Sequence, residues 1–360
     1  MIEAMNRLHF ALLGTVLAGM AFAAPATARP AYSLTDLGTL PGDQLSAPSA
    51  INRKGEVVGA TEKHAFLYSN GVMHDLGALP GGNISSAASI NDKSVAVGAS
   101  QFTDGGAIFH AVIFKHGDIE DIGFLPDWGN YGFATGVNNH MQVVGYSSPS
   151  RGSTYNRAFI WEKKKGMQDL GTLGGQYSLA TSINNAGVVT GNSQVPTGFG
   201  SRHAFVWSAA DGMRDLGTIA GDTSSGQHIN DKGHVVGAST INGFDNRNHA
   251  FLYKDGAMQD LGSLGGNSQF TDFSAAYGIN IKDEVVGSTY RKYQGGAAYQ
   301  IAFVWKKGKM TDLEKLVDAS GADYRFYTAT AINDAGQIAI DAIRKSTGEK
   351  RAVLLTPTGS

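Results

Sequence analysis

One apolar segment recurs along the whole chain, and this repetition constrains the fold more than any other feature. The segment reads HAFLY at 64–68 and returns as HAVIF (110–114), RAFIW (157–161), HAFVW (203–207), HAFLY (249–253), IAFVW (301–305) and RAVLL (351–355). Successive copies lie 46, 47, 46, 46, 52 and 50 residues apart. A period of this length is typical of one four-stranded propeller blade. We therefore expect one array of repeats rather than two or three separate domains.

Three further signals accompany this segment in a fixed order. A stretch of small residues comes first and ends in an asparagine, at Asn52, Asn91, Asn138, Asn184, Asn230, Asn280 and Asn333. A β-branched run such as EVVGA (56–60) follows, and after the HAF segment comes a strand such as MQDLGTL (167–173). Turn tetrads such as Asn-Asp-Lys-Gly (230–233) join the first strand to the second. Each repeat thus predicts four strands, and 312–321 is the one segment after residue 28 where we expect a short helix.

The two ends of the chain complete one another. The seventh repeat stops after 351–355 and has no Asp-Leu-Gly strand of its own. An additional strand of this type, YSLTDLGTL, stands at 32–40 and matches GVMHDLGAL at 71–79. A strand borrowed from the N-terminus would complete the last blade and close the ring. The sequence predicts an all-β fold, a seven-bladed β-propeller with the N-terminal strand closing the last blade.

Residue size predicts the radial order of the strands. Small side chains crowd the first strand of each repeat, as at 47–50, 85–89 and 134–136, where the sheets must converge on the axis. Large rings occupy the third strand, where neighbouring blades have diverged and leave volume to fill. These rings are Phe66, Phe159, Trp161, Phe205, Trp207, Phe251, Phe303 and Trp305. The HAF segment is therefore expected to be the wedge between blades.

The co-occurrence of these motifs resembles a known family, the bacterial extracellular HAF-repeat proteins. The resemblance covers 32–355 and rests on Asp-Leu-Gly-x-Leu-Gly-Gly (169–175, 260–266), on Ile-Asn-x-x-Gly and on HAF in the same order. The chain departs from the pattern at Arg157, Ile301 and Arg351, which replace the motif histidine, and at Leu313-Glu314, which replaces Leu-Gly. The resemblance implies an exported, propeller-like protein. It supplies no activity and no catalytic residue.

The first 28 residues carry the pattern of a secretory signal peptide. Arg7 precedes the apolar run LHFALLGTVLAGMAFAA, which is followed by small-residue cleavage patterns ending at Ala23 or Ala28. An uncleaved membrane anchor is the alternative. We expect an exported protein, periplasmic or extracellular, with no membrane span after cleavage. Because the chain contains no cysteine, its stability cannot come from disulfides.

Charge and motifs exclude several function classes. The chain has 29 Lys and Arg against 31 Asp and Glu and no long basic run, so no nucleic-acid partner is expected. The repeated histidines (His64, His110, His203, His249) would lie on a ring, too dispersed to bind one metal ion, and we expect no metal or cofactor. The repeated aspartates (Asp36, Asp75, Asp121, Asp169, Asp215, Asp260, Asp312) are expected to accept backbone N–H bonds. No hydrolase elbow, zinc-protease motif or phosphate loop is present.

Candidate binding residues lie where the repeats differ. The loops between second and third strands share a face, here named the variable face, with the crossovers between blades, and both vary in sequence. Aromatic crossovers at 127–133, 269–273 and 323–327 suit sugar rings or extended polymers, or they pack between blades. Near the axis, three larger polar residues replace small ones, or mark local repacking. The predicted ligand-binding residues are Trp128, Tyr131, Phe273, Tyr290, Arg291, Tyr324, Arg325, Gln227, His228 and Tyr277.

Two classes of function follow from these observations. The first is an exported, non-catalytic binding or scaffold propeller for a glycan, a peptide or a surface protein, expected to act as a monomer. The second is an extracellular polymer-acting enzyme, a glycan hydrolase or lyase, using single-copy residues such as Asp127, His228, Asp272 and Asp323. Hydrolysis would require two carboxylates about 5–9.5 Å apart. The lack of a visible catalytic set favours the binding module.

Overall fold

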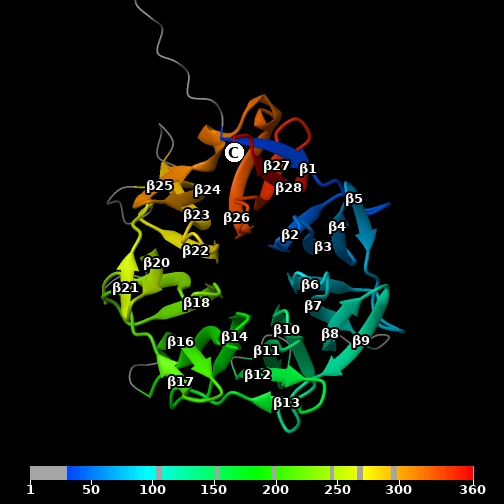
Figure 1. Cartoon of the computed structure of the whole chain (residues 1–360), viewed down its shortest axis with the longest axis vertical. Coiled ribbons are helices and arrows are strands. Elements are labelled where there is room, and N and C mark those ends of the chain that lie inside the picture. The colour runs from blue at the N-terminus through cyan, green and yellow to red at the C-terminus, as the bar shows by residue number, and fades with distance from the viewer. Residues whose placement is uncertain are drawn as a thin grey trace, which may run out of the picture.

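Seven four-stranded antiparallel sheets surround a central axis like the blades of a propeller (Figure 1). The computed structural model describes residues 31–102, 108–150, 153, 155–196, 200–243, 247–265, 271–292 and 298–359. The expected signal peptide, 1–28, lies outside these ranges. The predicted all-β, seven-bladed propeller is confirmed.

The innermost strand of each blade runs along the axis and carries mainly small residues. A short side chain is needed there because seven sheets converge. These strands are β2 (Ser46–Ile51), β6 (Ser85–Ile90), β10 (Tyr131–Val137), β14 (Ser178–Ile183), β18 (Ser224–Ile229), β22 (Ser274–Ile279) and β26 (Tyr324–Ile332).

The second and third strands form the buried middle of each blade. The second strands are β3 (Val57–Thr61), β7 (Ala96–Gln101), β11 (Val143–Ser148), β15 (Val189–Gln194), β19 (Val235–Thr240), β23 (Val285–Lys292) and β27 (Ile338–Arg344). The third strands are β4 (Ala65–Ser69), β8 (Phe109–Lys115), β12 (Arg157–Glu162), β16 (Arg202–Ser208), β20 (Asn248–Lys254), β24 (Ala298–Lys306) and β28 (Lys350–Pro357).

The HAF rings fill the space between blades, as predicted. Phe205 of β16 is fully buried and packs in one cluster with Val144 and Ile160 of the preceding blade. Phe66, Phe159, Phe251 and Phe303 are likewise fully buried. Burying one such side chain contributes about 1.5–3 kcal/mol. The core is therefore a ring of clusters, each shared by two neighbouring sheets.

The outer strands are short and end in the repeated aspartate, except for β9, which continues to Gly123. They are β1 (Tyr32–Asp36), β5 (Val72–Asp75), β9 (Asp118–Gly123), β13 (Gly166–Asp169), β17 (Gly212–Asp215), β21 (Ala257–Asp260) and β25 (Lys309–Asp312). Two 3₁₀ helices, η1 (Leu313–Leu316) and η2 (Ala319–Gly321), follow β25, within the segment where a short helix was expected. None of the helical segments in the described ranges has the length and apolar character needed to span a bilayer.

The N-terminal strand closes the ring. In Figure 1 the blue β1 lies beside the red β28, and the two pair antiparallel from Tyr32 opposite Pro357 to Asp36 opposite Val353. Tyr32, Leu37 and Leu40 are buried on this closing segment. The seventh sheet therefore has the order β1-β28-β27-β26 and combines both ends of the chain.

Candidate functional site

A β-bulge interrupts each innermost strand at the same place. In β14 the pairing with β15 skips from Ala180 to Ser182, so that Thr181 is left without a partner in the ladder. In the first six blades the second strand permits this close approach through a glycine, whereas blade seven has Ile340 at this position. A Cβ at Gly191 would lie 1.9 Å from the carbonyl oxygen of Leu179, which only glycine avoids. The bulge turns one extra side chain of each blade toward the axis.

The bulged residues line a central cavity of about 470 Å³. This size lies within the range of small-ligand pockets. The bulged positions are occupied by Ser49, Ala88, Thr135, Thr181, Gln227, Tyr277 and Thr330. Blades five and six thus place a long amide and an aromatic ring where the other blades have Ser, Ala or Thr. His228, the residue after Gln227, lines the same cavity.

Two threonine hydroxyls in the cavity wall donate hydrogen bonds to the backbone of the next blade. Thr135 Oγ1 donates to the carbonyl oxygen of Ala180 in the next blade at 2.9 Å, and Thr181 Oγ1 donates to that of Gly226 at 3.0 Å. Their hydroxyl protons are therefore engaged. Gln227 is different, because its Nε2 donates to Ser225 Oγ at 3.2 Å within its own strand.

His228 lies between the central cavity and the asparagine turns at the end of the channel. Its Nδ1 is shielded from solvent and has no hydrogen-bond partner among the described residues. Burial lowers the pKa of His228 to about 4, although the nearby carboxylates of Asp231 and Asp334 act in the opposite direction. The imidazole is therefore neutral at neutral pH, and its Nδ1 presents almost no accessible surface to the cavity.

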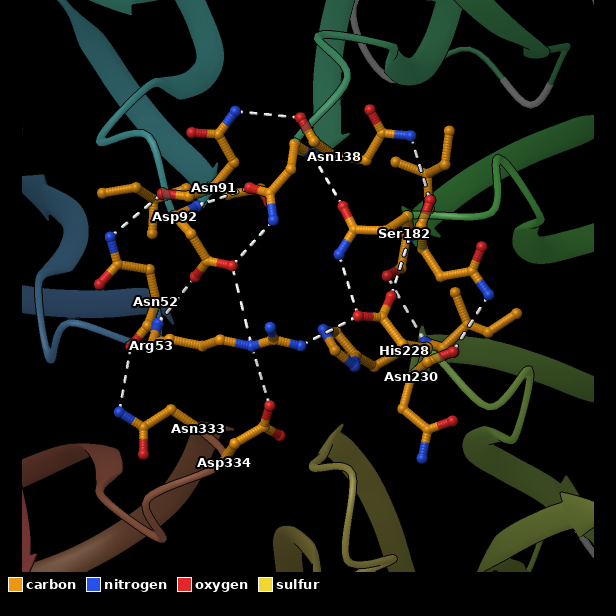
Figure 2. Close-up of a pocket in the computed structure, with 18 of the residues that line it drawn as sticks. Asn52, Arg53, Asn91, Asp92, Asn138, Ser182, His228, Asn230, Asn333 and Asp334 are labelled. Carbon is orange, nitrogen blue, oxygen red and sulfur yellow. Dashed lines mark hydrogen bonds and ion pairs between the residues drawn. The ribbon is translucent and has the colours of Figure 1, made fainter.

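A closed belt of seven asparagines surrounds the axis just beyond His228. Figure 2 labels Asn52, Asn91, Asn138, Asn230 and Asn333 of this belt. In each blade the Oδ1 accepts two backbone N–H bonds of its own turn, as Asn184 does from Ala186 and Val188. Each Nδ2 donates to the backbone carbonyl of the asparagine in the next blade, at 3.0–3.2 Å, and Asn333 returns to Asn52. The sequence predicted the turn but not this belt between blades.

Arg53 crosses the ring at this mouth of the channel. Its Nε lies 2.9 Å from Asp334 Oδ2 and 3.8 Å from Asp92 Oδ2, and its Nη2 lies 3.0 Å from Asp231 Oδ2. Figure 2 shows the side chain spanning the space between these blades. Taken by themselves, these four side chains carry a formal charge of −2. A signal for Arg53 was present in the sequence, because Asn or Asp follows the belt asparagine in most repeats.

The predicted residues of blades three and six are engaged with their neighbours. The guanidinium of Arg157 lies 4.5 Å from the centre of the Trp128 ring, and Tyr131 pairs with Ser148 at the start of β10. In blade six, Phe273 and Tyr290 meet edge to face at 6.2 Å. Arg291 forms an ion pair with Asp312 at 3.2 Å.

The two predicted residues of blade seven belong to the closing sheet. The hydroxyl of Tyr324 donates to Asp36 Oδ2 at 2.7 Å, and Arg344 pairs with the same carboxylate. Arg325 lies opposite Ile343 in the ladder of β26 and β27. The ten predicted residues are therefore divided. Seven surround blades three, six and seven, whereas Gln227, His228 and Tyr277 line one cavity.

The repeated aspartates accept backbone N–H bonds, as predicted. Asp75 Oδ1 accepts from the amide of Gly77 at 2.7 Å, and the equivalent bond is present in every blade. The repeated histidine completes the contact, since His64 Nδ1 lies 2.9 Å from Asp75 Oδ2. The same pairing joins His110 with Asp121, His203 with Asp215 and His249 with Asp260. These repeated pairs brace the outer strand.

Asp272, one of the residues considered for catalysis, is tied into an ion-pair cluster. It contacts His249 Nε2 at 2.8 Å and Arg247 Nη1 at 2.9 Å, while His249 Nδ1 contacts Asp260. An imidazole bonded to carboxylates through both nitrogens must carry two protons. Burial lowers the pKa of His249, but the bonds to Asp260 and Asp272 outweigh burial and raise it. The cluster anchors the crossover into blade six.

The other residues of the enzyme hypothesis lie in separate blades. Asp323 accepts from the backbone amide of Ser346 at 3.0 Å, and Asp127 occupies an exposed turn with a φ of 67°. Within the described ranges no group of three His, Cys, Asp or Glu side chains is arranged to hold a metal ion.

Comparison with known proteins supports the fold. No protein-family model and no curated protein sequence matches this chain. The extracellular domain of the putative one component system BT4673 from B. thetaiotaomicron matches 91% of this chain and 40% of its own length, at 8% identity and a TM-score of 0.53. The β-propeller domain of the Trilobed protease from Pyrococcus furiosus matches 88% of this chain and 97% of its own, at 8% identity and a TM-score of 0.50.

These similarities extend to architecture alone. The Pyrococcus domain has an open velcro topology, whereas β1 closes the ring in this chain. TolB from Acinetobacter baumannii matches 60% of this chain at 13% identity and a TM-score of 0.43. This chain spans 53% of TolB and 40% of the BT4673 domain. The fold is shared by binding domains and by parts of enzymes.

Proposed function

We propose that this chain is an exported, non-catalytic binding propeller of the HAF-repeat type, acting in the periplasm or outside the cell as a monomer. Its ligand is a glycan, a peptide or a surface protein, bound on the variable face and in the cavity below it. The observation that carries the proposal is the difference between blades five and six, which have Gln227 and Tyr277 at the bulge, and the other blades, which have Ser, Ala or Thr there. The repeated side chains are used for contacts within and between blades, while Gln227, His228 and Tyr277 depart from the repeat at the central cavity.

The rim contributes the remaining contacts. Trp128, Tyr131, Phe273, Tyr290, Arg291, Tyr324 and Arg325 surround blades three, six and seven, and we assign them to a polar-aromatic surface around the opening. Trp128 and Tyr290 are partly exposed rings beside charged groups, which favours sugar rings and peptide backbones, whereas Tyr324 is buried. The repeated Asn turns on the opposite face differ little from blade to blade, which favours a framework role there.

Binding is tested by exposing the exported chain to a glycan array and a peptide array, and then measuring each hit by calorimetry. Tyr277→Thr and Tyr290→Ala should weaken a genuine ligand by about 1–3 kcal/mol each, on the scale measured for stacking on aromatic side chains. Thr occupies the bulge in blades three, four and seven, so Tyr277→Thr is compatible with the fold.

The matched control is Lys232→Ala, in a turn on the opposite face. Equal losses from both faces, or losses from the control alone, would overturn the assignment of the binding face. Export is tested separately by N-terminal sequencing of the secreted protein, which should begin at Ala24 or Arg29. A soluble cytoplasmic product that retains Met1 would contradict the proposed location.

A further inference from the structure

The wall of the central cavity is polar but carries no formal charge. Four of the seven bulged side chains have the aliphatic hydroxyl of Ser or Thr, and the two largest are the amide of Gln227 and the phenol of Tyr277. Among the described residues that line the cavity there is no Asp, Glu, Lys or Arg, and a pKa of about 4 keeps His228 neutral at neutral pH. The wall therefore offers hydrogen bonds without ionic partners.

This composition disfavours two classes of ligand. A charged group that entered the cavity would lose its hydration and find no lining side chain of opposite charge, which is costly. A purely apolar ligand would displace water from the hydroxyls and the amide and leave them unpaired, at a cost for each group. The composition therefore favours an uncharged ligand that brings hydrogen-bonding groups of its own.

The hydrogen bonds already present in the wall determine what it can offer to a ligand. Thr135 and Thr181 donate their protons to backbone carbonyls, so their oxygens can only accept from a ligand. Thr328 is the reverse case, because its Oγ1 accepts from Gln300 Nε2 at 2.9 Å and keeps its own proton to donate. Donors and acceptors are thus mixed around the axis. A ligand hydroxyl can pair with either kind, because it donates and accepts at one atom.

Blades five to seven bring an aromatic ring and polar groups together on one side of the cavity. Gln227 and Tyr277 occupy the bulges of adjacent blades, and Thr328 and Thr330 line the cavity from blade seven. The ring of Tyr277 therefore comes from the blade between an amide and two hydroxyls. Blade seven departs from the repeat as well, since its innermost strand has a second bulge at Tyr327, whereas each of the other six has one. An aromatic face beside neutral polar groups suits a pyranose, which has a C–H face and hydroxyls at its edge.

We propose that the central cavity binds a single uncharged pyranose unit of a glycan, with the C–H face of the sugar on Tyr277 and its hydroxyls at Gln227 and Thr328. This inference rests on the proposed function and selects the glycan from its three ligand classes. The cavity of about 470 Å³ lies within the range of small-ligand pockets, so it accommodates one sugar unit. The rest of the glycan extends toward the variable face.

The test uses the exported full chain and the methyl glycosides of glucose, galactose and mannose, whose binding is measured by ligand-observed NMR. The controls are the corresponding uronic acid and 2-amino sugar, which keep each ring and add a negative or a positive charge. We expect at least one neutral glycoside to bind, and both of its charged counterparts to bind at least tenfold more weakly. Failure of all three neutral glycosides at tens of millimolar, or equal binding of both charged counterparts, would overturn the proposal.

Two substitutions locate the sugar in the cavity. Tyr277→Thr and Gln227→Thr each introduce the residue that blades three, four and seven have at the bulge, and thermal unfolding checks that the fold is intact. Each should weaken the neutral glycoside about tenfold through the loss of one stacking or hydrogen-bonding contact. Tyr277→Phe keeps the ring and should weaken it less than Tyr277→Thr does, and Lys232→Ala on the opposite face is the control. Full affinity in both threonine variants would contradict the proposal.

The outcomes separate this inference from the proposed function. If a peptide from the array binds and Tyr277→Thr weakens it, while no neutral glycoside binds, the binding propeller stands and the sugar site fails. If no ligand on either array responds to Tyr277→Thr or Tyr290→Ala, the proposed function fails as well.

Discussion

Two positions in each repeat, one in the innermost strand and one just after it, differ in how much they vary from blade to blade. The belt position is asparagine in all seven blades, whereas the bulge position, three residues earlier, is Ser, Ala, Thr, Gln or Tyr. The belt side chain makes three hydrogen bonds to backbone, one of them in the next blade, and each needs an amide of this length. The bulge side chain faces the cavity. A residue is held constant where it completes backbone bonding and is free to vary where it meets open space.

The strongest challenge to this framework is removal of the strand that closes it. Deleting Tyr32–Leu40 removes the partner of β28 and three buried side chains, Tyr32, Leu37 and Leu40. We expect a loss of stability several times the roughly 1 kcal/mol of a typical point mutation. Thermal unfolding of the deletion and of Thr35→Ala, a control on the exposed side of β1, measures it. A deletion that melts within a degree or two of the parent would show that closure contributes little.

A direct comparison of the two positions has a smaller expected effect. Asn184→Ala leaves two backbone amides in its own turn and the carbonyl of Asn230 without their partner, in a buried site. Each buried group left unpaired costs about 1–3 kcal/mol, so we expect a total of roughly 2–4 kcal/mol after partial relaxation. Ser49→Ala, at the exposed bulge of blade one, should stay within about 0.5 kcal/mol. Urea unfolding of both variants decides it, and similar losses would refute the distinction.

The smallest expected effect is the pH dependence of stability that arises from His228 and His249. The folded pKa of His228 is about 4, below the unfolded value of about 6.5, so the unfolded chain binds more protons between these values and stability falls as the pH drops through them. The loss should be on the order of 2 kcal/mol, because the His228 residue is only half-buried and solvent screens part of the effect. His228→Ser should remove it.

His249 should show the opposite sign. Its folded pKa is raised, so its contribution is complete below about pH 6.5 and is lost as the pH rises through the folded value. Urea unfolding between pH 4.5 and 9 compares the parent with His228→Ser and His249→Gln. If His249→Gln flattens the acidic side of the profile instead of the alkaline side, the assignment of the cluster is wrong.

The fold was predictable because the same pattern of buried residues recurs in all seven repeats. Phe205 and its equivalents, the closing strand and the N–H bonds to Asp75 and its equivalents all follow from the period and from residue type. The candidate site was only partly predictable. Gln227, His228 and Tyr277 break the repeat, which marks them in the sequence.

What the sequence left open depends on geometry across the ring. A turn asparagine predicts bonds to its own backbone, but its Nδ2 reaches a carbonyl 39 to 53 positions away, or 281 at the closure. Arg53 reaches Asp231 across the axis and Asp334 in the neighbouring seventh blade, which no local pattern specifies. Trp128, in the crossover between blades two and three, meets Arg157 at the start of β12. Such contacts follow from the closed circle and not from any one repeat.

Closure by β1 also sets an order of events during synthesis. Ser33 and Thr356, which face one another in the finished sheet, are 323 positions apart. At a translation rate of about 5–20 residues per second, β1 waits roughly 15 to 65 s for its partner to be made. During that time the strand is an unpaired edge, and a neighbouring copy that has just completed its own β28 offers it the same pairing. The segment that seals the mature ring is thus the one through which two nascent chains would exchange strands.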